Sequence, residues 1–180
     1  MDEAELNIRQ AYQDDYSQLI AVFPEPNERI SQAESAKLDD AITKAYKVIN
    51  DKTVSNFLGD AYFVVAKANH YKSNFFNALG FFDYVHEHYN KRNDLGQFSM
   101  AWKARSLIQL ELIDESKSTL DTALKYIQVK KKRSAADVYA IKAQLHIYNN
   151  QYEEAIVLLN KALKLLRNNK YYRIRWTFLL

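Results

Sequence analysis

Histidines and paired carboxylates are the side chains of this sequence with the clearest capacity for catalysis or metal binding. The four histidines are His70, His86, His88 and His146. His86 and His88 are two residues apart and face different sides of a helix, whereas a helical metal site needs ligands at i and i+4. Asp14–Asp15 and Asp39–Asp40 are adjacent and diverge in the same way, which favours capping or ion pairs with lysines. The sequence therefore predicts no catalytic residues, no metal site and no cofactor, and the protein is not expected to be an enzyme.

Positive charge is concentrated in the C-terminal part of the chain. Residues 1–50 contain 5 basic and 10 acidic side chains, whereas residues 111–180 contain 13 basic and 7 acidic ones. The basic run Lys130–Arg133 is similar to a nucleic-acid patch, but a solvated loop after a helix end explains it as well. We expect this run to form a solvated loop, and we expect no nucleic-acid partner. Binding of nucleic acid or of a membrane surface by the basic half is the weaker alternative.

Turn-forming residues are scarce, which indicates long helices with short connections. The 180 residues include 3 glycines and 2 prolines, and both prolines stand in Phe23-Pro24-Glu25-Pro26. These prolines predict a loop at 21–33. Elsewhere, apolar residues recur at helical spacing. They predict about nine helices, near 2–18, 35–50, 54–71, 74–89, 95–110, 113–128, 133–148, 152–167 and 171–180. No apolar run is long enough to span a membrane.

A repeat with a period of 38 to 39 residues is the strongest pattern in the sequence. Its clearest copy has small residues at Ala143, Ala155 and Ala162, with a turn at Asn149–Asn150. Two earlier copies match it in register, at Ala104, Ser116 and Ala123 and at Ala66, Ala78 and Val85. This is the tetratricopeptide pattern, in which a small residue in the first helix of a hairpin lets the second helix approach closely. The predicted fold is therefore an all-α, tetratricopeptide-like solenoid of helical hairpins with a right-handed superhelix.

The repeats predict one domain over residues 1–180, because each hairpin buries its apolar face only against a neighbour. Residues 1–50 are expected to form a degenerate N-terminal helix pair around the loop at 21–33. Three repeats follow, at 54–93, 94–131 and 132–169. Residues 170–180 are expected to be the truncated start of a further repeat, packed on the helix before it, in a chain that is a piece of a longer protein.

One stretch is similar to a particular family. Residues 11–24, which contain Asp14-Asp15-Tyr16 and Val22-Phe23-Pro24, resemble a signature of the tetratricopeptide lipoproteins of gliding motility and type IX secretion in Bacteroidetes, the SprE/PorW family. Residues 38–49, 60–72 and 175–180 resemble the family as well. The resemblance implies an adaptor at the periplasmic face of the outer membrane, tethered by a lipid outside this fragment, with type IX secretion components as partners. Without the resemblance, a soluble cytoplasmic protein is expected.

The groove lined by the first helix of each repeat is the main candidate for a binding surface. Alignment of the repeats places there the side chains of Asp60, Phe63, Lys67, His70, Phe98, Arg105, Ile108, Asp137 and Gln144. Each of them could instead be solvated or fill the superhelix. Lys67 and Arg105 have the charge to hold one acidic group together. The Lys, Asn and Arg set with which some tetratricopeptide domains clamp a C-terminal carboxylate is absent.

The Asp14, Asp15 and Tyr16 motif has two interpretations. We expect it to fasten the loop at 21–33, because carboxylates at a helix end can accept hydrogen bonds from backbone N–H groups. A docking point for a partner is the alternative. Altogether the sequence predicts a non-catalytic protein–protein interaction scaffold, and a generic peptide-binding module of a regulatory protein is the alternative to the secretion adaptor. The partner's identity and the oligomeric state stay open.

Overall fold

The structure is a computed structural model, and it describes residues 6, 21–25, 32–51, 56–89, 94–125, 132–166 and 168–180. Over these residues the chain forms eight complete α-helices and no strand, so the all-α prediction is confirmed. The helices are α2 (Gln32–Asn50), α3 (Leu58–Tyr71), α4 (Phe75–Tyr89), α5 (Leu95–Gln109), α6 (Ile113–Lys125), α7 (Lys132–Tyr148), α8 (Tyr152–Leu165) and α9 (Lys170–Phe178). The predicted helix at 2–18 lies outside the described residues except for Leu6, which is helical.

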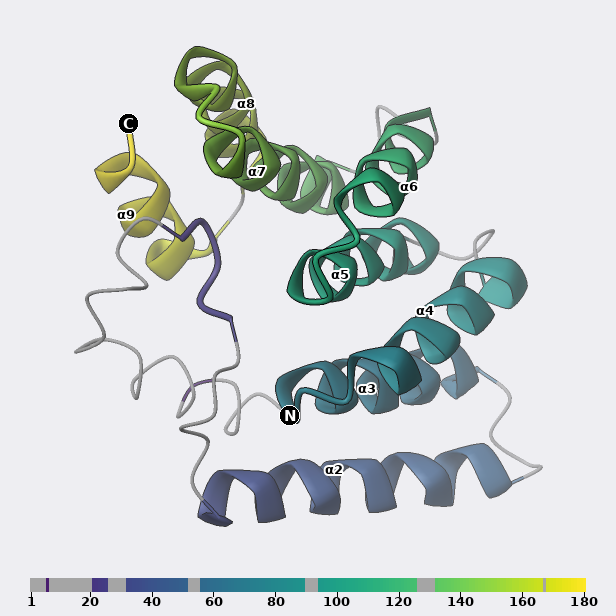
Figure 1. Cartoon of the computed structure of the whole chain (residues 1–180). Coiled ribbons are helices and arrows are strands. Elements are labelled where there is room, and N and C mark those ends of the chain that lie inside the picture. Colours follow the sequence, from purple (N-terminus) through teal and green to yellow (C-terminus); the bar gives the residue numbers. More distant parts are fainter. Residues whose placement is uncertain are drawn as a thin grey trace.

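The helices are stacked as hairpins (Figure 1). Each helix from α2 to α8 packs against the next one in the chain, and α3, α5 and α7 also pack against one another in sequence order. The first helices of the three hairpins therefore form one continuous layer. The described segment 21–25, drawn in purple, runs between α9 and this layer (Figure 1). The structure is thus a helical-hairpin solenoid of the tetratricopeptide type, as the repeat predicted.

The small residues of the repeat lie where the hairpins close. The first-helix alanines Ala66, Ala104 and Ala143 are completely buried. Their second-helix counterparts Ala78, Ser116, Ala155, Val85, Ala123 and Ala162 are buried as well. Ser116 replaces the alanine of the other repeats, and its hydroxyl donates to the backbone carbonyl of Ala104 at 3.0 Å. A buried hydroxyl is therefore accommodated without an unsatisfied polar atom.

The three hairpin turns share one backbone conformation. Ser73, Glu111 and Asn150 have φ values of 59°, 59° and 57°, and they follow one another at the period of the repeat. Each is the left-handed residue that ends the first helix, and the next residue donates back to a carbonyl of the last helical turn, as Asn74 does to Asn69 at 2.9 Å. The turns therefore repeat in register with the small residues.

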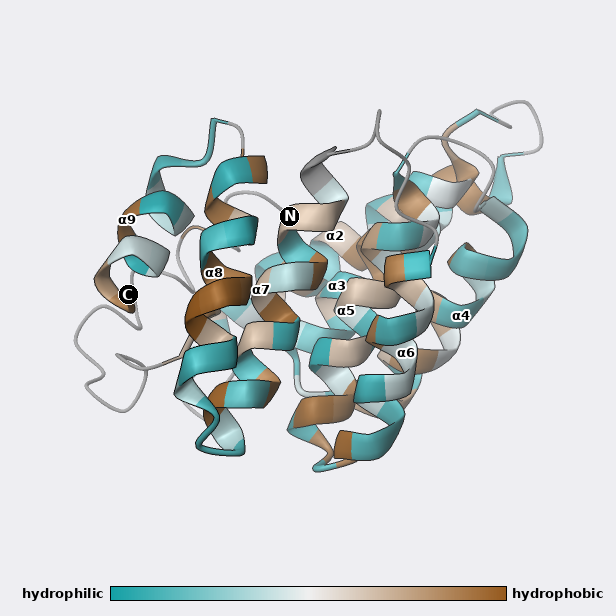
Figure 2. Ribbon diagram, turned by 90° about the horizontal axis from the view of Figure 1, so that it is seen from above, coloured by the Kyte–Doolittle hydropathy of each residue, from teal (hydrophilic) through white to brown (hydrophobic). Residues whose placement is uncertain are grey.

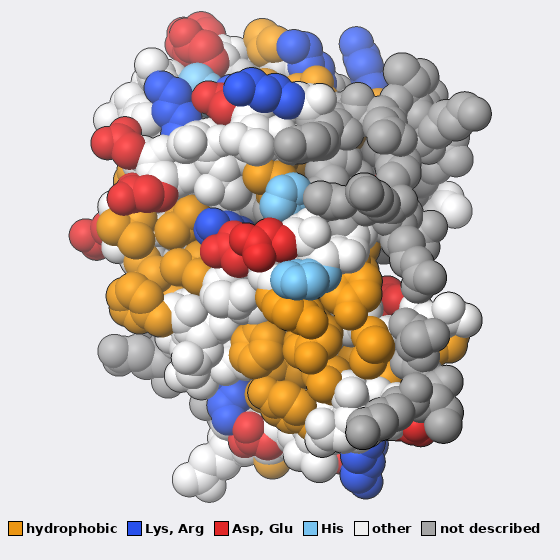
Figure 3. Space-filling model, turned by 90° about the vertical axis from the view of Figure 1, so that its right-hand side faces the viewer, with side chains coloured by type: hydrophobic (Ala, Val, Ile, Leu, Met, Phe, Trp, Pro, Cys, Tyr) orange, Lys and Arg blue, Asp and Glu red, His pale blue; other side chains and the backbone are white. Residues whose placement is uncertain are grey.

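Hydrophobic side chains alternate with polar ones around most helices, so each ribbon changes from brown to teal and back along its length (Figure 2). Some apolar surface stays exposed. Figure 3 shows hydrophobic side chains gathered on the side of the molecule that lies at the right of Figure 1, where α4 and α6 are found. Among individual side chains, Phe76 near the start of α4 is 74 % exposed. Further along α4, the ring of Tyr84 contacts that of Tyr62 on α3, with centroids 4.5 Å apart.

The left-handed turn residues give a test of the hairpin geometry. Glu111→Gly is expected to increase the free energy of unfolding by about 0.5–1 kcal/mol, because glycine adopts a positive φ without the strain that a Cβ causes. Asn150→Gly is the matched control, since asparagine already tolerates this conformation, and it should change stability by only a few tenths of a kcal/mol. Urea denaturation of the three proteins measures the effect. A loss of stability in Glu111→Gly would contradict the assigned turn.

Candidate functional site

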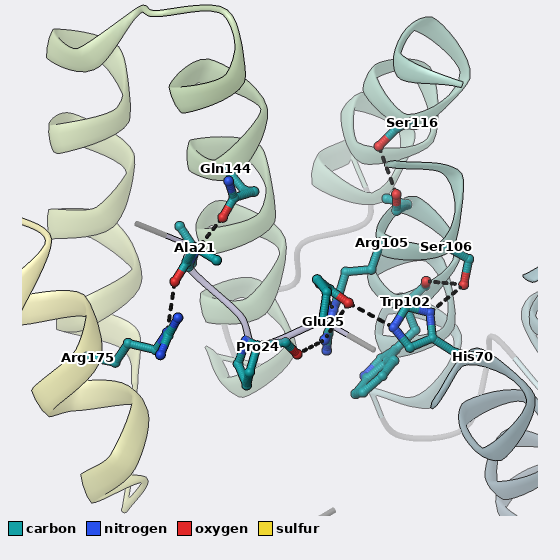
Figure 4. A network of polar contacts seen from close by, with 12 residues as sticks. Ala21, Pro24, Glu25, His70, Trp102, Arg105, Ser106, Ser116, Gln144 and Arg175 are labelled. Atoms are coloured by element: carbon teal, nitrogen blue, oxygen red, sulfur yellow. Dashed lines mark hydrogen bonds and ion pairs between the residues drawn. The ribbon is translucent and has the colours of Figure 1, made fainter. Parts of the chain in front are cut away.

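Three of the predicted groove residues converge on one segment of the chain. His70, Arg105 and Gln144 lie on α3, α5 and α7, and all three side chains are buried. Figure 4 shows them pointing toward residues 21–25, which cross the layer formed by these helices. These three groove residues therefore do not face open solvent, because a non-helical segment of the same chain covers them.

The carboxylate of Glu25 is the centre of this site. Arg105 donates to it twice, from Nε to Oε1 at 2.9 Å and from Nη2 to Oε2 at 3.1 Å. Nη2 also donates to the backbone carbonyl of Pro24 at 3.3 Å. Two parallel hydrogen bonds between a guanidinium and a carboxylate combine charge attraction with a fixed orientation. Arg105 therefore fixes both the side chain and the backbone of this end of the segment.

Aromatic rings border the Arg105 guanidinium. Its Cζ lies 4.1 Å from the ring centroid of Trp102 and 4.6 Å from that of Phe23. The faces of aromatic rings attract cations, and they also exclude water from the charge pair. Trp102 additionally contacts the Nζ of Lys67, which lies 4.6 Å from its centroid. Arg105 and His70 therefore both contact Glu25, whereas Lys67 lies over the ring of Trp102.

His70 completes the coordination of Glu25. Its Nε2 lies 2.9 Å from Oε2 of Glu25, and its Nδ1 lies 2.9 Å from Oγ of Ser106. An ionised carboxylate only accepts hydrogen bonds, so Nε2 has to carry a proton. In a neutral ring Nδ1 then accepts from the Ser106 hydroxyl, whose alternative acceptor is the more distant Trp102 carbonyl at 3.2 Å. Glu25 therefore selects the tautomer that carries its proton on Nε2, and the Ser106 hydroxyl satisfies the other ring nitrogen.

The electrostatics of the cluster favour an ionised Glu25 and a neutral His70. Burial by itself raises the pKa of Glu25, but the charge of Arg105 and the hydrogen bond from His70 outweigh it, and this pKa lies below its ordinary value. Burial is the largest influence on His70 and lowers its pKa, although Glu25 acts in the opposite direction. Burial also opposes the charge on Arg105, but Glu25 outweighs it and raises the pKa of Arg105. The pair Glu25–Arg105 is therefore charged at neutral pH.

The backbone of the segment is held at its other end. The N–H of Val22 donates to Oε1 of Gln144, and the carbonyl of Val22 accepts from Nε1 of Trp176 at 3.0 Å. Arg175 Nε donates to the carbonyl of Ala21 at 2.8 Å. Both hydrogen-bonding groups of Val22 are thus satisfied by side chains from α7 and α9.

An aromatic pocket encloses the middle of the segment. The ring of Phe23 meets those of Tyr172 and Trp176 edge to face, with centroids 5.1 Å and 5.6 Å apart. Both rings come from α9, and Trp176 is completely buried. Edge-to-face contacts of this kind add to the gain from burying the ring. Helix α9 packs on the preceding helix α8, as predicted, and it also packs on residues 21–25, which was not predicted.

The other predicted groove residues lie elsewhere. Phe63 packs on the rings of Phe82 and Trp102, with centroids 5.9 Å and 6.5 Å apart. Ile108 is buried in the same core cluster as Val22 and Phe23. The remaining three are Asp60, which is exposed on α3, and Phe98 and Asp137, which are half-buried on α5 and α7. Asp14, Asp15 and Tyr16 lie outside the described residues, so their fastening role stays a prediction.

Sequence reasoning missed the occupant of the groove. The Val22-Phe23-Pro24 stretch was interpreted as a loop and as a family signature, and α9 was interpreted as an unfinished repeat. The available signal was chemical: Val22 and Phe23 are large apolar residues inside a proline-containing loop, and such residues need a pocket. From the sequence, Trp176 is expected only to be buried somewhere, and no role is predicted for Tyr172, although these two residues form the pocket.

One hairpin of the chain is similar to a known repeat family. Residues 136–169 match the tetratricopeptide repeat family, a stretch that covers most of α7 and all of α8. The match covers one hairpin of the chain, and the other described hairpins stack on it in the same repeat-like arrangement. Tetratricopeptide repeats are typically modules that bind other proteins. No curated protein matches the chain. Within the described part, no cluster of three His, Asp or Glu side chains could hold a metal ion, and no helix is long and apolar enough to cross a membrane.

Removal of the charge on Glu25 tests the energetic importance of the cluster. Glu25→Gln is expected to lower the free energy of unfolding by about 3 kcal/mol at pH 7, because it leaves the buried Arg105 guanidinium without a counter-charge. Asp40→Asn is the matched control, since Asp40 forms an exposed i,i+4 pair with Lys44, and it should change stability by less than about 0.5 kcal/mol. Chemical denaturation followed by circular dichroism measures both.

The difference in the free energy of unfolding between the wild-type protein and Glu25→Gln should depend on pH. Because the pKa of Glu25 is lowered in the folded state, its stabilising contribution is complete above about 4.5, the ordinary value, and is lost as the pH falls through the folded-state pKa. The difference between the wild-type protein and Glu25→Gln should therefore narrow below pH 4.5. A difference that is no larger than that of Asp40→Asn at pH 7 would contradict the assigned ion pair.

Proposed function

We propose that the chain is a non-catalytic protein-binding scaffold whose concave layer of first helices binds an extended segment of a partner. The observation that supports this proposal is the set of contacts from His70, Arg105 and Gln144 to residues 21–25. These side chains bind a backbone N–H and a carboxylate, which are chemical features that any acidic peptide offers. The tetratricopeptide match at 136–169 includes Gln144 and is consistent with this use of the surface.

At a finer level, we propose that the scaffold is an adaptor of the type IX secretion and gliding machinery. The support is the resemblance of residues 11–24 to lipoproteins of that machinery. In this proposal the chain lies at the periplasmic face of the outer membrane, and its partners are other components of the secretion system. The resemblance includes Val22-Phe23-Pro24, in which Val22 contacts α7 and Phe23 contacts α9.

Site-specific photo-crosslinking tests the groove. A benzoylphenylalanine is placed at Tyr148, an exposed residue at the end of α7 that lies one helical turn after Gln144 on the same helix face. The same amino acid at Phe76 is the matched control, because Tyr148 and Phe76 are both exposed aromatic residues and Phe76 lies on α4. Each protein is irradiated in envelope extract from a gliding, protein-secreting Bacteroidetes species, and the adducts are identified by mass spectrometry.

We expect type IX secretion components to crosslink at Tyr148 and not at Phe76. Adducts at Phe76 alone would contradict the proposal that the concave layer binds partners. Adducts at Tyr148 that contain no secretion component would contradict the adaptor role and leave the protein-binding role in place.

A further inference from the structure

Residues 21–25 make the contacts of a bound peptide ligand. The segment is non-helical, and its side-chain partners lie 45 to 154 residues away in the sequence, on α3, α5, α7 and α9. The polar contacts lie at its two ends and the aromatic contacts in the middle. This distribution is the same as in recognition of an extended peptide, in which backbone groups are hydrogen-bonded and pockets receive particular side chains.

The contacts define what the site accepts. Gln144 and Trp176 bind the backbone of Val22, and the complete burial of the Val22 side chain in the hydrophobic core requires an apolar residue at that position. Tyr172 and Trp176 require an aromatic ring one residue later. The nitrogen of Pro24 has no hydrogen to satisfy, and its carbonyl is bound by Arg105. Arg105 and His70 then require a carboxylate.

We infer that the groove binds, in another protein, an extended segment of the form apolar–aromatic–proline–acidic, and that residues 21–25 are an intramolecular competitor for the same site. This inference rests on the proposed protein-binding function and names its ligand. Charge complementarity selects an acidic partner segment, since Arg105 is buried and needs an opposite charge whichever chain supplies it. The partner segment takes over the contacts of Glu25 and Phe23 one for one.

An internal competitor changes the affinity by a calculable amount. A tethered segment has an effective concentration on the order of 1 mM. For an intrinsic dissociation constant on the order of 10 µM, the tethered segment weakens binding of a partner about 100-fold. The chain would therefore respond only to a partner that binds more tightly than its own segment, or to one present at high local concentration.

The test uses the full chain and a fluorescein-labelled, capped peptide with the sequence of residues 20–26. In the double variant Phe23→Ala/Glu25→Gln the internal segment lacks both side chains that fill the site. We expect this variant to bind the peptide at least tenfold more tightly than the wild-type chain does, as measured by fluorescence anisotropy. A peptide in which glutamine replaces the residue equivalent to Glu25 should bind the variant at least tenfold more weakly.

A matched control separates this effect from general destabilisation. Phe76→Ala/Glu87→Gln makes the same chemical changes at exposed positions of α4, and its affinity for the peptide should equal that of the wild-type chain. Circular dichroism reports whether each variant is folded. If Phe23→Ala/Glu25→Gln is unfolded, addition of the peptide at millimolar concentration should restore its helical signal.

Two results would overturn the inference. One is a folded double variant that does not bind the peptide, and the other is an unfolded double variant that the peptide does not restore, which would make residues 21–25 a permanent part of the core. Photo-crosslinking at Tyr148 in the same variant distinguishes failure of this inference from failure of the proposed scaffold function. Partner adducts that persist there without peptide binding leave the scaffold role intact, whereas the absence of both contradicts the scaffold role as well.

Discussion

The ion pair between Arg105 and Glu25 is the interaction on which the packing of residues 21–25 against α3, α5 and α7 depends. The guanidinium is buried on α5, and a buried charge without a partner destabilises a fold by several kcal/mol. Its carboxylate partner comes from a residue 80 positions earlier in the chain. This requirement fixes the path of residues 21–25 across the layer. The path in turn puts Phe23 against Tyr172 and Trp176, which explains why α9 packs where it does.

The repeat explains why the polar side chains line up. Arg105 and Gln144 each follow the small residue of a first helix, Ala104 and Ala143, so they occupy equivalent positions one period apart. Lys67 is the equivalent residue in the first repeat, and His70 lies three residues further on the same helix face. A straight segment laid across successive repeats therefore meets a row of polar groups at regular intervals, which is how a solenoid presents an extended binding surface.

Most of the fold could be predicted from the sequence, because the information lies in local periodicity. The register of Ala66, Ala104 and Ala143 was sufficient to place the first helices and to identify Arg105 and Gln144 as groove residues. The helix starts were predicted to within about four residues, as α3 shows by beginning at Leu58 where 54 was expected. Helix ends and first turns depend on capping and on neighbouring packing, which a periodic pattern does not encode.

The occupant of the groove could not be predicted in the same way. No local pattern connects Val22 with Gln144 or Ala21 with Arg175, since these contacts span 122 and 154 residues. The sequence indicates only the chemistry of each partner separately: an arginine in an aligned groove position, and a glutamate beside apolar residues in a loop. Pairing them required the three-dimensional path of the chain, which proline-containing loops leave undetermined.

The geometry of the Glu25 site also separates this groove from tetratricopeptide domains that clamp a chain terminus. The set of residues for such a clamp was absent from the sequence, yet the structure still holds a carboxylate, with Arg105 and His70. That carboxylate is the side chain of Glu25 and not a chain terminus. Arg105 also binds the backbone carbonyl of the preceding residue, Pro24. The site therefore holds an internal acidic residue of the same chain, through its carboxylate and through the carbonyl that precedes it.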